Sequence, residues 1–384
     1  MIICHIITRL IVGGAQENTL LTCVGLAERG HKVYLLTGPD AGPEGSLLAM
    51  ADQAPYRLVV IPSLHRALRP LADWRALGEL TRILRELNPH IVHTHSSKAG
   101  ILGRLAARKA GVPKIVHSIH GMSFNRTQRF FTRWFYAALE RYCARFSDKL
   151  IGVADAMAHQ SVAAGVAGAD KFVTVYSGML TEWYQPSRYD RAAVRRAWAV
   201  GPDDIVVGTV ARLFTNKGYE VLIPAMVEVL KRMPNLFFVW VGDGAMRAEY
   251  ERRLTSAGIR GRVHLTGLVP PERVAESLAG MDMLVHASQW EGLPRAAVQA
   301  LLMEKPVISF DIDGAGEVVV PDRTGVLVPL NDVHRLAGAI VELAADPVRR
   351  EHFGRTGREE CLRRFDHRVM VEKIDELYQE LLAT

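Results

Sequence analysis

The chain has 384 residues, of which 49% are hydrophobic, with a formal net charge of +6 and a pI near 9.2. A chain of this length is too long to fold around one ordinary hydrophobic core, and it fits two domains. The modest positive charge allows contact with nucleotides, phosphates, anionic lipids or nucleic acid, and does not select among them. The four cysteines show no CxxC or CxxxC spacing. This argues against a zinc ribbon and against a disulfide framework.

The amino-terminal run MIICHIITRLIVGG is apolar but too short to span a bilayer, and no basic region precedes it. We interpret it as the first strand. No other run approaches the roughly 20 apolar residues that a membrane helix needs. We therefore expect a cytoplasmic protein, with peripheral attachment to the inner face of the cytoplasmic membrane as an open alternative.

Short apolar runs alternate with amphipathic stretches through residues 1–180, which predicts an α/β domain with a parallel, doubly wound sheet. The expected strands are 2–7, 32–37, 58–61, 91–94, 115–119, 150–153 and 172–175. The expected helices are 16–28, 73–87, 99–109, 128–145 and 155–163.

The alternation of apolar and amphipathic stretches stops between residues 177 and 204, a charged segment with Gly and Pro. We interpret 181–204 as a linker. A second Rossmann-like domain is expected at 205–365. Its strands are 205–210, 236–241, 262–266, 283–287, 307–310 and 326–328. Its helices are 218–232, 245–257, 271–279, 294–304, 333–345 and 347–364. Residues 366–384 form a separate helix that we expect to pack back toward the amino-terminal domain. Two such domains predict a cleft between them, where ligands prefer to bind.

In the first domain, Gly13 and Gly14 lie just before a helix, where glycines let the backbone approach a phosphate or sugar. The loop lacks the GxGxxG pattern, and no acidic residue closes the second strand, which ends at Thr37; this argues against NAD or FAD. A glycine pair that only makes the strand-to-helix turn is the competing interpretation.

Four histidines lie at the ends of two successive strands: His93, His95, His117 and His120. Strand alternation sends His93 and His95 to the same face, whereas His117 and His120 point differently. Because no carboxylate joins them, we expect no metal site. His120 is the candidate catalytic or hydrogen-bonding group, since histidine donates, accepts or carries a proton near neutral pH. His93 and His117 are expected to be buried, hydrogen-bonded strand residues.

Residues 125–145 form a basic stretch in which Arg126, Arg129 and Arg133 alternate with aromatic side chains. Three interpretations stay open: a core-facing helix with a solvated basic face, a membrane-surface helix, and a helix that binds single-stranded nucleic acid by stacking. The first two are favoured, and we expect no nucleic acid partner.

In the second domain, Arg212 and Lys217 flank a loop directly after a strand, where two cations would hold a diphosphate. No GxxxxGK[ST] pattern occurs, so a P-loop is excluded. Glu291 lies in a further strand-end loop just before a helix, at the sheet edge where ligands and anions bind. Asp311 and Asp313 match a metal-binding Asp-x-Asp, but we interpret them as ordinary loop residues.

Several of these motifs occur in a fixed order, and together they resemble the retaining glycosyltransferases of family four, or group 1, across nearly the whole chain. The motifs are Gly13-Gly14, HTHSSKAGILGRLAARKAGVP (93–113), HSIHG (117–121), VARLFTNKG (210–218), VGDG (241–244) and EGLPRAAVQALLMEKPVI (291–308). The resemblance implies the GT-B fold and an enzyme of bacterial cell-surface polysaccharide or lipopolysaccharide synthesis.

The resemblance also implies a role for each matching residue. Gly13 and Gly14 would lie against the donor pyrophosphate or sugar, and His120 would contact the transferred sugar. Arg212 and Lys217 would neutralise the leaving diphosphate, and Glu291 would bind sugar hydroxyls. The remaining implied contacts are Gly242, Asp243, Gly244, Leu268, Gly292, Leu293 and Gln299 for the donor, and His95 and Ser96 for the acceptor.

One position departs from the family pattern, which has glutamate where this chain has Gln299. That carboxylate would hold the ribose, and an amide can still bond to hydroxyls. We therefore expect binding of a nucleoside diphosphate sugar, of UDP or GDP type, with altered preference.

The expected reaction is transfer of a sugar with retention to a hydroxyl of a glycan or lipid-linked acceptor, without metal or cofactor and after domain closure. The alternatives are a non-catalytic donor-binding subunit of a heteromeric transferase, suggested by Gln299, and a nucleotide-sugar epimerase.

Overall fold

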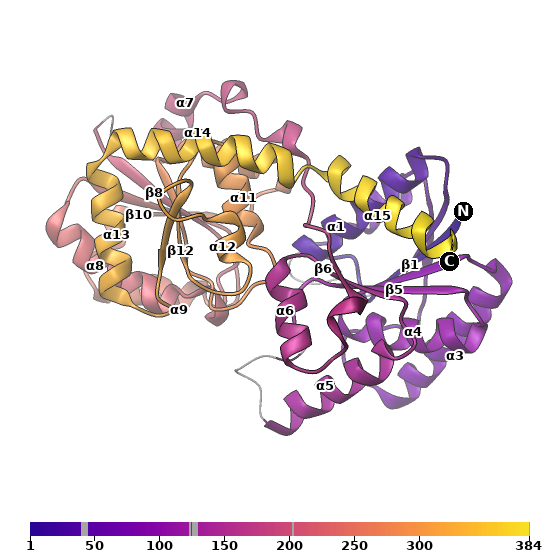
Figure 1. Cartoon of the computed structure of the whole chain (residues 1–384). Coiled ribbons are helices and arrows are strands. Elements are labelled where there is room, and N and C mark those ends of the chain that lie inside the picture. Colours follow the sequence, from indigo (N-terminus) through magenta and orange to yellow (C-terminus); the bar gives the residue numbers. More distant parts are fainter. Residues whose placement is uncertain (40–44, 123, 125–129, 202, 384) are drawn as a thin grey trace. The chain divides into compact units, whose positions relative to one another are not determined.

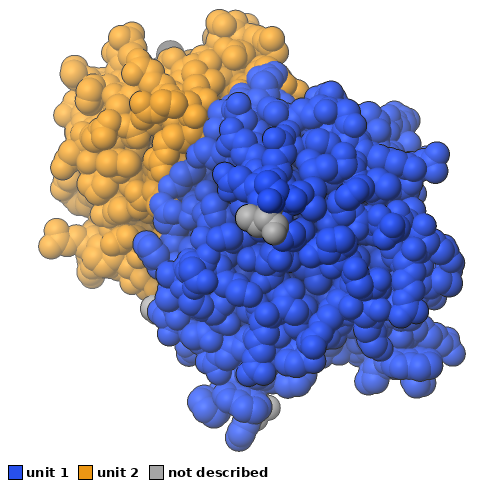
Figure 2. All heavy atoms as spheres, turned by 45° about the vertical axis from the view of Figure 1, so that its right-hand side comes forward, with its two compact units in different colours: residues 1–179, 366–384 blue, residues 180–365 orange. Residues whose placement is uncertain are grey.

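The computed structural model describes residues 1–39, 45–122, 124, 130–201 and 203–383. They form two compact units, each built around one parallel sheet (Figure 1). Unit 1 comprises Met1–Met179 together with Asp366–Thr384, and unit 2 comprises Leu180–Phe365; Figure 2 colours them separately. The predicted α/β fold with two doubly wound parallel sheets is confirmed.

The sheet of unit 1 has seven strands in the order β3-β2-β1-β4-β5-β6-β7. Five of the six residues of the first strand are buried, as expected for a parallel sheet covered on both faces. The strands are β1 (Ile2–Ile7), β2 (Lys32–Thr37), β3 (Arg57–Val60), β4 (Ile91–His95), β5 (Lys114–Ile119), β6 (Lys149–Gly152) and β7 (Phe172–Thr174).

Helices cover both faces of this sheet and enclose a separate core on each. The helices are α1 (Gly14–Glu28), α2 (Leu48–Asp52), α3 (Pro70–Leu87), α4 (Ser97–Ala110), α5 (Phe130–Ala144), α6 (Asp155–Ala163) and α15 (His367–Ala383). Helices α1 and α15 share one core, which includes the buried Cys23, and helices α3 and α4 share the other, which includes the buried Cys4. Both cysteines are free and buried.

The sheet of unit 2 has six strands in the order β10-β9-β8-β11-β12-β13. The strands are β8 (Ile205–Val210), β9 (Leu236–Val241), β10 (Val263–Gly267), β11 (Met283–His286), β12 (Val307–Phe310) and β13 (Gly325–Val328). The helices are α7 (Arg191–Ala197), α8 (Tyr219–Arg232), α9 (Arg247–Ser256), α10 (Val274–Ala279), α11 (Arg295–Leu302), α12 (Ala315–Val318), α13 (Val333–Ala345) and α14 (Pro347–Arg364).

Local sequence explains where several helices begin and end. The side chain of Asp346 accepts a hydrogen bond from the Arg349 N–H, and Pro347 follows at the first helical position, which starts α14. In unit 1, helix α4 ends at Gly111, which adopts the left-handed conformation that glycine tolerates best.

The segment that the sequence suggested as a linker, residues 181–204, is instead part of unit 2. Arg191 and Arg195 both contact the carboxylate of Asp282, at 2.7 and 3.1 Å, and so anchor α7 next to β11. Sequence pattern cannot show this, because the partners lie some 90 residues apart.

The carboxyl-terminal helix α15 completes the core of unit 1 on the α1 side. Ile374 and Tyr378 are buried against it, and Asp375 accepts a hydrogen bond from His31 at 2.8 Å. Gly25 on α1 permits the close approach, since a Cβ there would lie 2.6 Å from Val371.

We expect Ile374→Ala to lower the free energy of unfolding of unit 1 by about 2–5 kcal/mol, because it leaves a cavity in this core. Lys373→Ala, at an exposed position on the same helix, should change it by less than about 0.5 kcal/mol. Urea unfolding followed by hydrogen exchange of unit 1 peptides measures both. Equal effects of the two variants would contradict the packing described for α15.

Candidate functional site

Each sheet reverses its winding direction at one place, and the candidate residues gather at these places. In unit 1 the reversal lies between β1 and β4, and in unit 2 it lies between β8 and β11. Loops that leave the carboxyl ends of two strands at such a reversal diverge, which opens a crevice for ligands.

In unit 2 the loops after β8 and β11 are joined by an ion pair between Lys217 and Glu291. Lys217 ends the turn η4 (Thr215–Lys217), and Glu291 lies in the loop before α11. Beside the ion pair, the Gln289 N–H donates to the Asn216 carbonyl oxygen at 3.0 Å. The two side chains are only 14% and 22% exposed, so the pair is held in a partly desolvated place.

Gly218 makes the close approach of these two loops possible. It has a φ of +74°, and a Cβ at this position would lie 1.8 Å from the carbonyl oxygen of Ala287. Any other residue would push the β11 loop away and separate Lys217 from Glu291.

Glu291 remains ionised in this environment. Burial by itself would raise the pKa of its carboxyl group, but Lys217 and His286 outweigh that effect and hold the pKa well below its ordinary range. The His286 Nε2 atom lies 3.5 Å from the Glu291 carboxylate. A charged carboxylate that is already oriented by two partners is suited to accept hydrogen bonds from hydroxyl groups.

Asp313, the second aspartate of the Asp-x-Asp motif, has a structural role that sequence analysis missed. Its Oδ2 atom accepts a hydrogen bond of 2.7 Å from the backbone N–H of Glu291. It therefore positions the Glu291 loop from the end of β12, while Asp311 is exposed. The expectation that both are ordinary loop residues is too simple for Asp313.

The loop after β9 supports the loop after β8 from the other side. Gly242 has a φ of +138°, and a Cβ there would lie 2.2 Å from the carbonyl oxygen of Ala211. The backbone oxygen of Asp243 accepts from the Leu213 N–H at 3.0 Å, and its side chain pairs with Arg247 at 2.9 Å. A Cβ on Gly244 would be 2.5 Å from the Leu213 carbonyl oxygen. Thus the VGDG motif sets the path of the loop that carries Arg212.

The other predicted donor residues lie around this framework. Arg212 is exposed and stacks over the ring of Phe214, and Leu268 is 57% exposed. Gln299 is half-buried on α11, while the Gly292 and Leu293 side of the loop is buried. The structure thus brings Lys217 and Glu291 into direct contact, and it places the others on neighbouring segments of the same unit.

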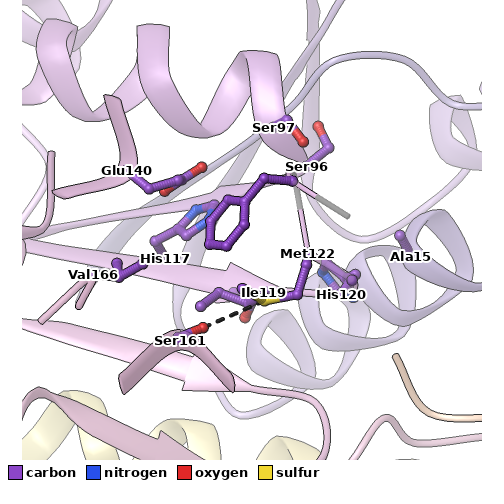
Figure 3. Close-up of a pocket in the computed structure, with 13 residues that line it drawn as sticks. Ala15, Ser96, Ser97, His117, Ile119, His120, Met122, Glu140, Ser161 and Val166 are labelled. Carbon is purple, nitrogen blue, oxygen red and sulfur yellow. Dashed lines mark hydrogen bonds between the residues drawn. The ribbon is translucent and has the colours of Figure 1, made fainter. Parts of the chain in front are cut away.

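Unit 1 contains a cavity of about 270 Å³ at the carboxyl ends of its strands (Figure 3). His117 and Glu140 lie on one side of it, and His120 and Ala15 on the other. Ala15 follows Gly13 and Gly14, so the glycine turn lies at the edge of the cavity. Ser96 also lines it, and its hydroxyl bonds to that of Thr8 at 2.7 Å.

The histidines are distributed differently from the expectation in one respect. His93 and His117 are buried and hydrogen-bonded, as predicted, and His93 and His95 share a face. However, His120 does not point away from that face, because its Nε2 lies 3.0 Å from the Nδ1 of His95. His120 follows the end of β5, where strand alternation no longer applies. His95 is buried and is not among the residues that line the cavity, whereas Ser96 lines it.

Glu140 is a cavity residue that sequence analysis missed. It projects from α5 and pairs with the fully buried Arg104 at 2.6 Å. Its position among the buried Ala137, Cys143 and Ala144 on one helical face is the signal that could have revealed it.

The opposite face of α5 is exposed and aromatic. Phe130, Phe131 and Trp134 are 74%, 81% and 59% exposed, and Arg133 is exposed beside them. Arg126 and Arg129 lie outside the described residues. Within the part of the chain that the structure describes, no helix is long and apolar enough to cross a membrane.

Comparison with solved structures defines the class of fold. The chain is similar to Anabaena HepE in complex with UDP, with a TM-score of 0.83, 22% identity, and coverage of 99% of this chain and 100% of that one. It is also similar to a glycosyltransferase from Rickettsia africae, with a TM-score of 0.83, 18% identity, and coverage of 99% and 98%. The fold is therefore that of the GT-B glycosyltransferases.

Family comparison places the chain within that class. Residues 13–178 match the Glycosyl transferase 4-like domain, and residues 190–360 match Glycosyl transferases group 1. The chain is thus a glycosyltransferase with a 4-like amino-terminal half and a group 1 carboxyl-terminal half, as its motifs predict.

Several relatives match most of the chain, and two of them are described here. The first is an Escherichia coli UDP-Gal:α-D-GlcNAc-diphosphoundecaprenol α-1,3-galactosyltransferase, 28% identical over 99% of this chain and 97% of its own. The second is a Mycobacterium tuberculosis GDP-mannose-dependent α-mannosyltransferase, 28% identical over 86% and 84%.

We expect Glu291→Gln to lower the free energy of unfolding at pH 7 by roughly 1.5–3 kcal/mol, because Lys217 loses its charged partner. The folded pKa of Glu291 lies below its unfolded value of about 4.3. The contribution of the carboxylate is thus fully present above the unfolded pKa and is lost as the pH falls below it. Urea unfolding of both proteins should therefore show a difference that shrinks below about pH 4. A difference that stays constant down to pH 3 would contradict the proposed ion pair.

Proposed function

We propose that this protein transfers a sugar from a nucleoside diphosphate sugar to a hydroxyl group of a lipid-linked or surface glycan, with retention at the anomeric carbon. The observation that carries the proposal is the Lys217–Glu291 pair at the strand reversal of unit 2. It provides a cation for a diphosphate and an oriented carboxylate for sugar hydroxyls in one place. The full-length likeness to the E. coli galactosyltransferase supports the same reaction type.

In this proposal no metal ion is needed to stabilise the leaving diphosphate. Arg212 is exposed at the strand end, and Lys217 lies a few residues further along the same loop. The amino-terminal end of α11 adds its N–H groups and partial positive charge. Two cations and a helix end stabilise the negative charge that develops as the sugar–phosphate bond breaks.

The base of the donor is not inherited from the relatives, because they differ. One is named for UDP-Gal and the other for GDP-mannose. Gln299 would bind the ribose hydroxyls as an amide, which both donates and accepts. We propose a UDP-hexose as the donor, since UDP-Gal is the donor in the name of the E. coli relative, which matches 99% of this chain.

We further propose that the acceptor is presented at an anionic membrane surface, to which the exposed face of α5 binds. Phe130, Phe131 and Trp134 would enter the interface, and Arg133 would contact lipid headgroups. The name of the E. coli relative gives a GlcNAc-diphosphoundecaprenol as its acceptor, which is a lipid-linked sugar.

Gln299 also favours a second candidate, a subunit that binds the donor but does not turn it over without a partner. Donor binding without product formation by the isolated chain would support that candidate. An epimerase would instead release an altered nucleotide sugar without any acceptor.

We expect Arg212→Ala to lower the kcat of transfer by about 10²–10³-fold, since one of the cations at the leaving diphosphate is lost. Arg232→Ala is a matched control, because it removes an exposed arginine from the far end of α8. The assay uses UDP-Gal, UDP-Glc, UDP-GlcNAc and GDP-mannose with a lipid-linked sugar acceptor, and proton NMR of the product gives its anomeric configuration. Equal activity of the two variants, or an inverted product, would refute the mechanism.

We expect Phe131→Ser with Arg133→Ala to reduce co-sedimentation with anionic vesicles at least about fivefold, since each arginine near such a surface contributes about 1 kcal/mol. The control pair is Val348→Ser with Arg252→Ala, which alters equally exposed residues of unit 2. Neutral vesicles should bind all the proteins weakly. Unchanged binding of the α5 variant to anionic vesicles would remove the membrane proposal and leave the sugar transfer untouched.

A further inference from the structure

A row of three histidines crosses unit 1 from the middle of the sheet to the cavity. His5 Nδ1 lies 2.9 Å from His95 Nε2, and His95 Nδ1 lies 3.0 Å from His120 Nε2. These residues come from β1, from β4 and from the segment after β5, which are neighbours in the sheet. Only His120 reaches the cavity, while His5 and His95 are buried.

The inner two histidines are neutral. Burial lowers the pKa of His5 to about 3, and burial together with the neighbouring His93 lowers that of His95 well below its ordinary value. A neutral imidazole has one N–H donor and one bare nitrogen that accepts. The two hydrogen bonds of His95 must therefore run in the same direction along the row. Either His95 accepts from His5 and donates to His120, or it accepts from His120 and donates to His5.

The inner end of the row selects the direction. The Nε2 atom of His5 is buried, and none of the described residues offers it a hydrogen-bond partner. An orphaned buried N–H is rarer than an acceptor without a donor, so this nitrogen is the bare one. The His5 proton is then on Nδ1, the His95 proton is also on Nδ1, and His120 receives a hydrogen bond at Nε2.

From this geometry we infer that His95, supported by His5, is a positioning residue that holds His120 as the tautomer with its proton on Nδ1. The inference rests on the proposed sugar transfer for its functional meaning. His120 would then donate a hydrogen bond to the sugar through Nδ1, and the hydrogen bond from His95 to Nε2 would fix the orientation of its ring. The opposite tautomer would require both hydrogen bonds of the row to reverse and would bury an unpaired N–H.

His93 lies beside the row without being part of it. Its ring is 4.3 Å from that of His95, but its Nδ1 bonds to the Tyr378 hydroxyl at 2.5 Å and its Nε2 to the Ser118 hydroxyl at 2.7 Å. Hydroxyl groups rotate and serve either tautomer, so His93 imposes no direction. Tyr378→Phe is therefore a matched control that disturbs the same core but leaves the row intact.

A metal ion is the competing use of these side chains, since ring nitrogens of His5, His93 and His95 lie within 4.8 Å of one another. Both nitrogens of His93 and of His95 already have hydrogen-bond partners. A metal would have to replace those bonds, so we favour the hydrogen-bonded row.

The test is NMR of the full chain with ¹⁵N-labelled histidine side chains, in which long-range ¹H–¹⁵N correlations distinguish the two tautomers. The His120 signals are assigned by their loss in His120→Asn. The expected result is a neutral His120 with its proton on Nδ1 in the wild type and in Tyr378→Phe. A proton on Nε2 of His120 in the wild type, or one equivalent of bound metal in the purified protein, would overturn the inference.

Variants of His95 add a functional readout. His95→Leu removes the donor to His120, and we expect a mixture of tautomers and a fall in kcat of about 100-fold with little change in donor KM; a wrong histidine tautomer costs about 10⁴-fold in the serine proteases. His95→Asn places an amide N–H near the former Nδ1 position, so it should restore the tautomer and most of kcat. Equal losses in both variants would refute the positioning role.

The two proposals can fail separately. The wild-type NMR result needs no substrate and no folded variant, so it tests the tautomer by itself. If the tautomer is as expected but no donor is ever turned over, the proposed function fails and the histidine row stands.

Discussion

The arrangement of both units depends on one constraint, the reversal of strand order beside the first strand of each sheet. In parallel sheets the connecting helices must pass to one face or the other, and where the direction changes the loops at the strand ends separate. In unit 1 this happens at β1 and β4, which carry His5 and His95, and in unit 2 at β8 and β11, which lead to Lys217 and Glu291. The chain therefore presents polar groups at the same topological position twice, with different chemistry.

The polar groups at the two strand reversals differ in their electrostatics. In unit 2 the side chains are charged, and each charge has a partner nearby: Glu291 is held between Lys217 and His286, and its loop is fixed by Asp313. In unit 1, His5 and His95 are neutral because they are buried, and they are joined by a hydrogen bond and not by an ion pair. In unit 2, Gly218 and Gly242 let loops approach each other at distances that exclude a side chain.

Much of the fold could be predicted from the sequence, because buried parallel strands are continuous apolar runs that need no knowledge of their partners. The first strands of both sheets, for example, have the expected bounds. The sequence does not predict helix α2, and α7 lies in the segment interpreted as a linker, because its anchor Asp282 is far along the chain. The site motifs of unit 2 were visible as residue types after strands. By contrast, the roles of Asp313 and Glu140 depend on contacts between distant segments, and the position of His120 depends on backbone beyond the end of a strand, where alternation gives no guidance.

The assignment of α15 to unit 1 has a consequence for the order of folding during synthesis. Residues 180–365 form unit 2 without any help from the termini, so this unit can fold as soon as it leaves the ribosome. Unit 1 begins before unit 2 but is completed after it, because Met370, Ile374 and Tyr378 belong to its core and are synthesised after all of unit 2. Until then the apolar side of α1 is uncovered. The amino-terminal part of the chain therefore stays incompletely folded, and accessible to chaperones, until α15 has been synthesised.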